Sequence, residues 1–168
     1  RKGNINMLKK KIIILLTLLI SITIVGCDRK VKQVSFEQRA YEGIQFLLDK
    51  DEVNKNLELI KYEYIKMDNE NTDIEELKYN WQVSLESQLQ ILSKFKSETR
   101  GELYNNIYNE SEKILNKISE YYDLIFEGLQ LDDERLRDIS ISINKDIDRL
   151  NKLLEEFKEE NIQKFIEE

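Results

Sequence analysis

Histidine is absent from the 168 residues of this chain, and cysteine occurs once, at Cys27. Without histidine the chain has no Ser-His or Cys-His nucleophile pair and no imidazole that could transfer protons. The Glu-x-x-His pattern of di-metal helical bundles is excluded, as are zinc sites built from cysteine and histidine. These absences predict a protein that is not an enzyme and that carries no metal or other cofactor.

Proline is also absent, and glycine occurs five times. Sheets and loop-rich folds use both residues in turns, so their scarcity favours long helices.

Basic residues are few beyond residue 26. The first 26 residues hold five basic and no acidic residues, which leaves 21 basic and 33 acidic residues from Cys27 onward, a net charge of −12. Because such a chain repels phosphate backbones, nucleic acid is not expected as a partner.

The N-terminal region begins with a short basic stretch at residues 7–11 (MLKKK), followed by fourteen uncharged residues. A transmembrane helix needs about 20 apolar residues, whereas the shorter run is typical of a secretory signal peptide. The basic stretch of a signal peptide usually starts at the initiator methionine. We therefore interpret Met7 as the start and residues 1–6 as translated upstream sequence.

The last two residues of this run and the two that follow it are an aliphatic residue, a second aliphatic residue, a glycine and a cysteine: Ile24, Val25, Gly26 and Cys27. This order resembles the lipobox of bacterial lipoproteins, and the resemblance covers residues 7–27. It implies a signal peptide at residues 1–26, a diacylglyceryl group on the Cys27 sulfur, and a mature protein anchored to the outer face of the bacterial cytoplasmic membrane. Lipidation also accounts for a lone cysteine in an exported chain, and two acyl chains suffice for stable anchoring.

Residues 27–34 form the predicted tether between the lipid and the folded domain. Its basic residues are Arg29, Lys30 and Lys32. They are suited to attraction toward an anionic membrane surface, at about 1 kcal/mol each, and equally suited to keeping a linker soluble.

The remaining residues, 35–168, show apolar positions at helical spacings of three and four. Capping-box patterns predict helix starts at Ser35 and Thr72, Gly101 suits a left-handed position after a helix, and the polar residues 49–56 predict that the first helix frays or breaks there. The predicted core positions are Phe36, Ala40, Ile44, Leu47, Leu57, Ile60, Tyr64 and Met67; Ile74, Leu77, Trp81, Leu85, Leu89, Leu92 and Phe95; Leu103, Ile107, Ser111, Leu115, Ile118, Tyr122, Ile125 and Leu129; and Leu136, Ser140, Ile143, Ile147, Leu150, Leu154 and Phe157.

About four helices of comparable length with short connections predict an all-α, up-down antiparallel bundle. The alternative is an elongated, coiled-coil-like hairpin, because 35% of the residues are charged and the last helix has a heptad-like seam.

The acidic residues give no recognisable site. The stretches that begin at Asp49 and Asp68 fail the EF-hand pattern. Adjacent carboxylates such as Asp132 and Asp133 are expected to face solvent on amphipathic helices rather than to share a cleft.

Tyrosine is the remaining enrichment, since seven tyrosines and Trp81 fall at or beside the apolar stripes. Amphipathic rings suit both the margin of a core and protein-binding surfaces, and we favour the core margin. Tyr104 and Tyr108, four residues apart, are the best candidates for a recognition patch.

The predicted function is a non-enzymatic, membrane-anchored extracytoplasmic lipoprotein whose helical scaffold binds another protein or a component of the cell envelope. The alternative is a helical lipoprotein that binds a small apolar or cationic ligand in a pocket near Trp81. An exposed cavity at Trp81 would favour the ligand-binding protein, and a filled core would favour the scaffold.

Overall fold

The structure, a computed structural model, describes residues 34–69, 74–96, 100–127 and 134–161. The chain divides into two compact units, Arg1–Gln33 and Val34–Glu168, and all described residues belong to the second. The predicted signal peptide and lipobox, with all of the tether except Val34, therefore lie outside the described residues, as do Leu129 and the side chain of Met67.

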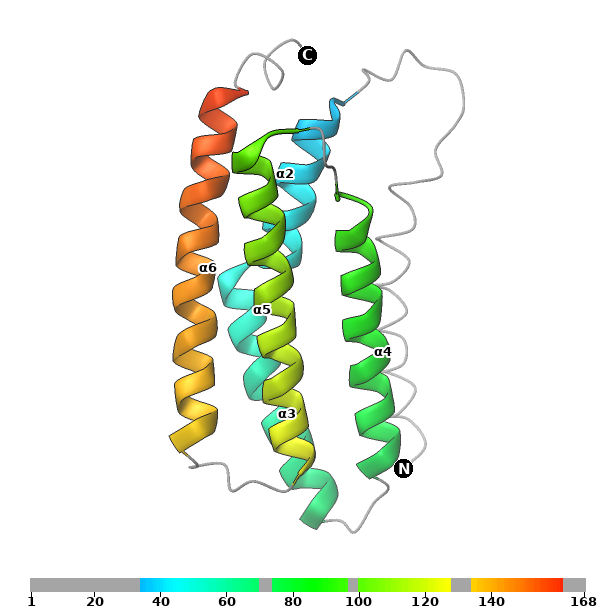
Figure 1. The fold of residues 1–168 in the computed structure, drawn as a ribbon. Helices are drawn as coiled ribbons and strands as arrows, with labels where there is room; N and C mark the ends of the chain where they lie inside the picture. Colours follow the sequence, from blue (N-terminus) through cyan, green and yellow to red (C-terminus); the bar gives the residue numbers. More distant parts are fainter. Residues whose placement is uncertain (1–33, 70–73, 97–99, 128–133, 162–168) are drawn as a thin grey trace, which may run out of the picture. The chain divides into compact units, whose positions relative to one another are not determined.

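The second unit consists of helices, and no strand occurs among its described residues. The helices are α2 (Phe36–Leu47), α3 (Lys50–Asn69), α4 (Ile74–Ser93), α5 (Glu102–Phe126) and α6 (Glu134–Glu160). Helices α2 and α3 run in the same direction and together form one arm, and α4, α5 and α6 alternate in direction as the other three (Figure 1). The predicted all-α up-down bundle is thus confirmed, with four arms around one core rather than a coiled-coil hairpin.

The first arm breaks at Leu48 and Asp49, at the start of the polar segment where a break was expected. Asp49 caps α3, because its side-chain oxygen accepts hydrogen bonds from the backbone N–H groups of Asp51 (3.1 Å) and Glu52 (3.0 Å). Leu48 continues the stripe of Ala40 and Ile44 at a spacing of four residues and is 1% exposed in the core, whereas Leu47 only packs against it. The assignment of Leu47 as the core position was therefore wrong by one residue.

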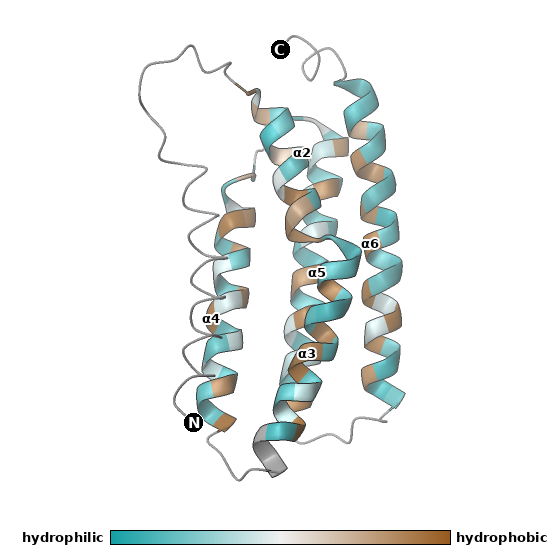
Figure 2. Cartoon of the chain, turned by 180° about the vertical axis from the view of Figure 1, so that it is seen from behind, coloured by the Kyte–Doolittle hydropathy of each residue, from teal (hydrophilic) through white to brown (hydrophobic). Residues whose placement is uncertain are grey.

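Helix α5 lies at the centre of the bundle and packs against α3, α4 and α6. With neighbours on three sides it buries a wide face, which includes Tyr104, Tyr108, Ile114 and Tyr121 beside the predicted stripe. Helix α4 packs against α3 and α5, and its buried residues are Leu77, Leu85 and Leu92. Hydrophilic and hydrophobic residues alternate around the helices, as this amphipathic packing requires (Figure 2).

Gly101 has φ 88° and ψ 172°, a conformation open mainly to glycine. The expectation of a positive φ is confirmed. However, Gly101 is the N-cap of α5 rather than the residue that ends the preceding helix.

Candidate functional site

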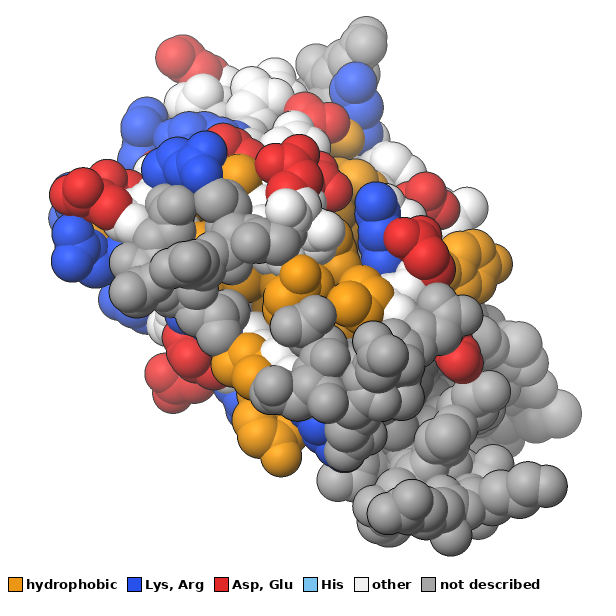
Figure 3. Space-filling model, turned by 90° about the horizontal axis from the view of Figure 1, so that it is seen from below, with side chains coloured by type: hydrophobic (Ala, Val, Ile, Leu, Met, Phe, Trp, Pro, Cys, Tyr) orange, Lys and Arg blue, Asp and Glu red, His pale blue; other side chains and the backbone are white. Residues whose placement is uncertain are grey.

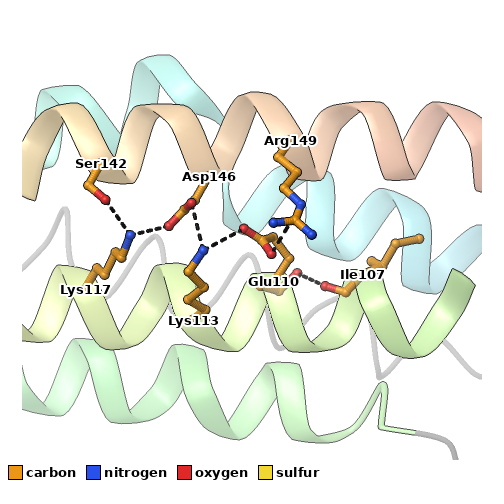
Figure 4. Close-up of polar contacts among 8 residues, drawn as sticks. Ile107, Glu110, Lys113, Lys117, Ser142, Asp146 and Arg149 are labelled. Atoms are coloured by element: carbon orange, nitrogen blue, oxygen red, sulfur yellow. Dashed lines mark hydrogen bonds and ion pairs between the residues drawn. The ribbon is translucent and has the colours of Figure 1, made fainter. Parts of the chain in front are cut away.

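Charged side chains from α5 and α6 meet along the contact between these two helices (Figure 4). Asp146 of α6 accepts hydrogen bonds from Lys117 (2.5 Å) and Lys113 (2.9 Å) of α5. Lys113 also contacts Glu110 at 3.2 Å, and Arg149 lies 3.8 Å from the second oxygen of Glu110. We call these five residues the α5–α6 ion-pair network.

The network favours the charged forms of Asp146 and Lys113. Burial works against ionisation of Asp146, but hydrogen bonds and charges from Lys117 and Lys113 outweigh it, so the pKa of this carboxyl lies below its usual value. The hydrogen bond to Asp146 is in turn the largest cause of a raised pKa at Lys113. Carboxylates committed to cations in this way are suited to fixing two helices in register rather than to exchanging protons.

Helix α6 is also joined to the first arm by polar contacts. Asn54 and Asn144 exchange two amide hydrogen bonds of 2.9 Å, and Lys50 donates to Asp148 at 2.6 Å. Near the other end of α6, the Tyr41 hydroxyl donates to Glu155 at 3.0 Å. Polar pairs at fixed positions along the helices disfavour sliding of α6 along the first arm, because a shifted register would leave these groups unpaired.

Tyr104 and Tyr108 lie in the core. Tyr104 is 1% exposed, its hydroxyl donates to the backbone carbonyl of Phe95, and its ring contacts Phe36 and Phe157. Burial raises its pKa to about 12. Tyr108 is 8% exposed and lies under the Lys96 ammonium. This burial corrects the prediction of a recognition patch at these tyrosines and agrees with a packing role.

Trp81 lies in a packed contact between α3, α4 and α5. Its ring meets Tyr122 edge to face, with 5.2 Å between ring centroids, and its indole N–H donates to Glu63 of α3. Burial raises the pKa of Glu63, and the hydrogen bond from Trp81 partly offsets this. Trp81 thus fills space between helices.

A shallow pocket of about 420 Å³ lies at the end of the bundle where α2 and α5 begin and α6 ends. Leu103, Tyr104 and Phe157 contribute apolar groups to it, and Trp81 is not among its lining residues. Arg100 at its edge pairs with Glu37 and lies 3.9 Å above the ring of Phe36. The guanidinium is thus committed to partners within the bundle.

Large apolar side chains reach solvent mainly on the first two arms. Among the described residues, seven are exposed, and five of these belong to α3 and α4. Hydrophobic side chains are also visible on the surface in Figure 3, which views the molecule from the end where α3 leads into α4. Tyr62 and Tyr79 were noted in the sequence only as part of the tyrosine enrichment. The sequence did contain a signal for this exposed face. Apolar residues recur every three positions on the side of α3 opposite its core residues, at Leu59, Tyr62 and Ile65.

Comparisons with known protein families, with curated proteins and with solved structures give no match to this chain. Within the described ranges, none of the helices has the length and apolar character needed to cross a bilayer. The same residues contain no group of three or more cysteine, aspartate or glutamate side chains placed to hold a metal ion.

Proposed function

We propose that this protein is a non-enzymatic, membrane-anchored extracytoplasmic lipoprotein whose helical bundle is a scaffold for binding another protein or an envelope component. The observation that carries the proposal is the four-residue sequence ending at Cys27. It closes a basic and then apolar segment, and it contains the only cysteine of the chain. A diacylglyceryl group at this position would provide the two acyl chains that stable anchoring takes.

The packing of the bundle supports the scaffold role. The side chains at its centre fill the space between four arms, and the carboxylates of the α5–α6 ion-pair network are paired with cations. General acid–base catalysis instead uses a carboxyl group in a cleft within reach of a substrate. The exposed tyrosines of α3 and α4 are of the residue type that dominates protein interfaces.

The small-ligand alternative has less support. It calls for an exposed cavity lined by Trp81, whereas this side chain is packed between helices, and the pocket described above lies at the other end of the bundle.

Metabolic labelling with a fatty-acid analogue tests the anchor. We expect the native protein to be labelled and recovered with membranes, and Cys27→Ala to be unlabelled. A Tyr79→Ala protein, with an intact lipobox, provides the matched control and should be labelled like the native protein. Equal labelling of Cys27→Ala would refute the anchor.

A further inference from the structure

We propose that the outer surface of the α3–α4 hairpin is a docking surface for a basic polypeptide. This inference rests on the proposed function and identifies the kind of partner that the scaffold binds. The surface is defined by four exposed apolar residues, which we call the hairpin patch: Leu59, Tyr62, Tyr79 and Val83.

The four residues form two levels along the hairpin. Helix α3 ends at Asn69 and α4 begins at Ile74. With a rise of about 1.5 Å per residue, Tyr62 and Tyr79 lie about 10 and 8 Å from these ends. Leu59 and Val83 lie about 15 and 14 Å from them, one helical turn further along. Because α3 and α4 are packed against each other, each level places one apolar residue on each of two neighbouring helices.

The hairpin patch faces away from the bundle core. Tyr62 is 64% and Tyr79 is 66% exposed. Each follows a buried residue by two positions, Ile60 and Leu77, and two positions turn a helix by about 200°. Exposed tyrosines on rigid helices have a large contact area and lose little side-chain entropy on binding, which is the character of interface hot spots.

The charge of the hairpin selects the class of partner. Residues 58–86 contain eight acidic and three basic residues, a net charge of −5. Glu58, beside Leu59, is largely exposed and pairs with Lys61 of the same helix at 3.0 Å. An anionic lipid surface and a second copy of this acidic chain are both repelled, whereas a basic polypeptide has complementary charge.

The predicted tether is continuous in sequence with α2 and not with the α3–α4 hairpin. Val34 lies at the start of α2, at the opposite end of the bundle from the connection between α3 and α4 (Figure 1). Six residues lie between Cys27 and Val34, and the seven Cα-to-Cα steps span at most about 25 Å. An anchor at Cys27 would therefore join the bundle at the start of α2, which is not part of the hairpin patch.

The test uses the lipidated protein in phosphatidylcholine nanodiscs, with empty nanodiscs as the reference. The probes are a Lys/Leu helical peptide of about 20 residues and a Glu/Leu peptide with the same apolar pattern. We expect the native protein to bind the lysine peptide, and the double variant Tyr62→Ala/Tyr79→Ala to bind it at least about fivefold more weakly. Phe46→Ala, an equally exposed aromatic on α2, is the matched control and should bind like the native protein.

Each contrary result overturns the docking proposal: no binding of the lysine peptide, equal binding of the glutamate peptide, or equal loss in the Phe46→Ala control. Binding of the native protein to phosphatidylglycerol vesicles that is lost in the double variant would assign the patch to a lipid surface instead. Fatty-acid labelling of the same preparations separates the two proposals. A protein that is labelled but does not bind the lysine peptide refutes the docking surface alone. A protein that is not labelled refutes the anchor.

Discussion

Tyr104 illustrates how a single side chain joins several parts of the bundle. Its ring contacts Phe36 of α2 and Phe157 of α6, and its hydroxyl donates to the carbonyl of Phe95 after α4. The sequence suggested a tyrosine near the core of α5, because Tyr104 adjoins the predicted stripe. It did not reveal the burial, which arises from neighbours on three sides of α5.

Replacing Tyr104 with alanine is expected to lower the free energy of unfolding by about 3–5 kcal/mol, the usual cost of removing a buried aromatic ring. Tyr79→Ala is the control, since an exposed tyrosine should change stability by no more than about 0.5 kcal/mol. Urea unfolding followed by circular dichroism measures both. Similar losses for the two variants would contradict the burial of Tyr104.

Asp146 gives a residue-scale prediction with a pH dependence. Lys117 and Lys113 lower its pKa in the folded state, so its stabilising effect is present above the unfolded pKa, about 3.9. The effect is lost as the pH falls through the lower, folded value. At pH 7 we expect Asp146→Asn to cost about 2 kcal/mol, as for hydrogen bonds to charged groups, and the difference from the native protein to shrink below about pH 4.

The matched control for this variant is Asp148→Asn. Asp148 pairs with Lys50 on the surface, where both side chains are largely exposed, so its replacement should cost less than about 1 kcal/mol. Urea unfolding at pH 7 and below pH 4 measures both variants. If Asp146→Asn and Asp148→Asn cost the same at pH 7, the network does not have the stabilising role assigned to it.

At the scale of elements, the helices follow from the sequence wherever one face is clearly apolar. The stripe predicted for the last helix matches α6, in which Ile143, Ile147 and Leu150 are buried. The break in the first arm was also visible as a polar segment. The choice between Leu47 and Leu48 was not visible, because spacings of three and four residues after Ile44 are both helical and packing against the other arms decides between them.

Asp49 makes this break testable. Its side chain accepts two backbone N–H groups at the start of α3, so Asp49→Ala should lower stability by about 1 kcal/mol. Asp51→Ala, one position into α3, removes a favourable charge from the first turn but no cap, and should cost only about 0.3–0.5 kcal/mol. Thermal unfolding of both proteins measures the difference, and equal costs would rule out a capping role for Asp49.

At the scale of the whole molecule, the polar contacts between arms could not have been predicted from the sequence. Asn54 and Asn144 lie 90 positions apart, and Lys117 and Asp146 lie 29 apart. Such pairs depend on which arms are neighbours and at what height, and amphipathic periodicity specifies neither. The hairpin patch could not be recognised from the sequence for a related reason. A second apolar face on a helix is noticed only after the first face has been assigned to the core.

The other three arms all pack against α5, which predicts that the two ends of the bundle unfold together. Trp81 is the only tryptophan and contacts Tyr122 toward the end opposite Tyr104. Its fluorescence should therefore follow the same urea transition as circular dichroism, as expected for one cooperative unit. Tyr104→Ala should shift both curves to lower urea by the same amount. If α4 instead separates first, the fluorescence transition of Trp81 will precede the loss of helicity and stay in place in the Tyr104→Ala protein.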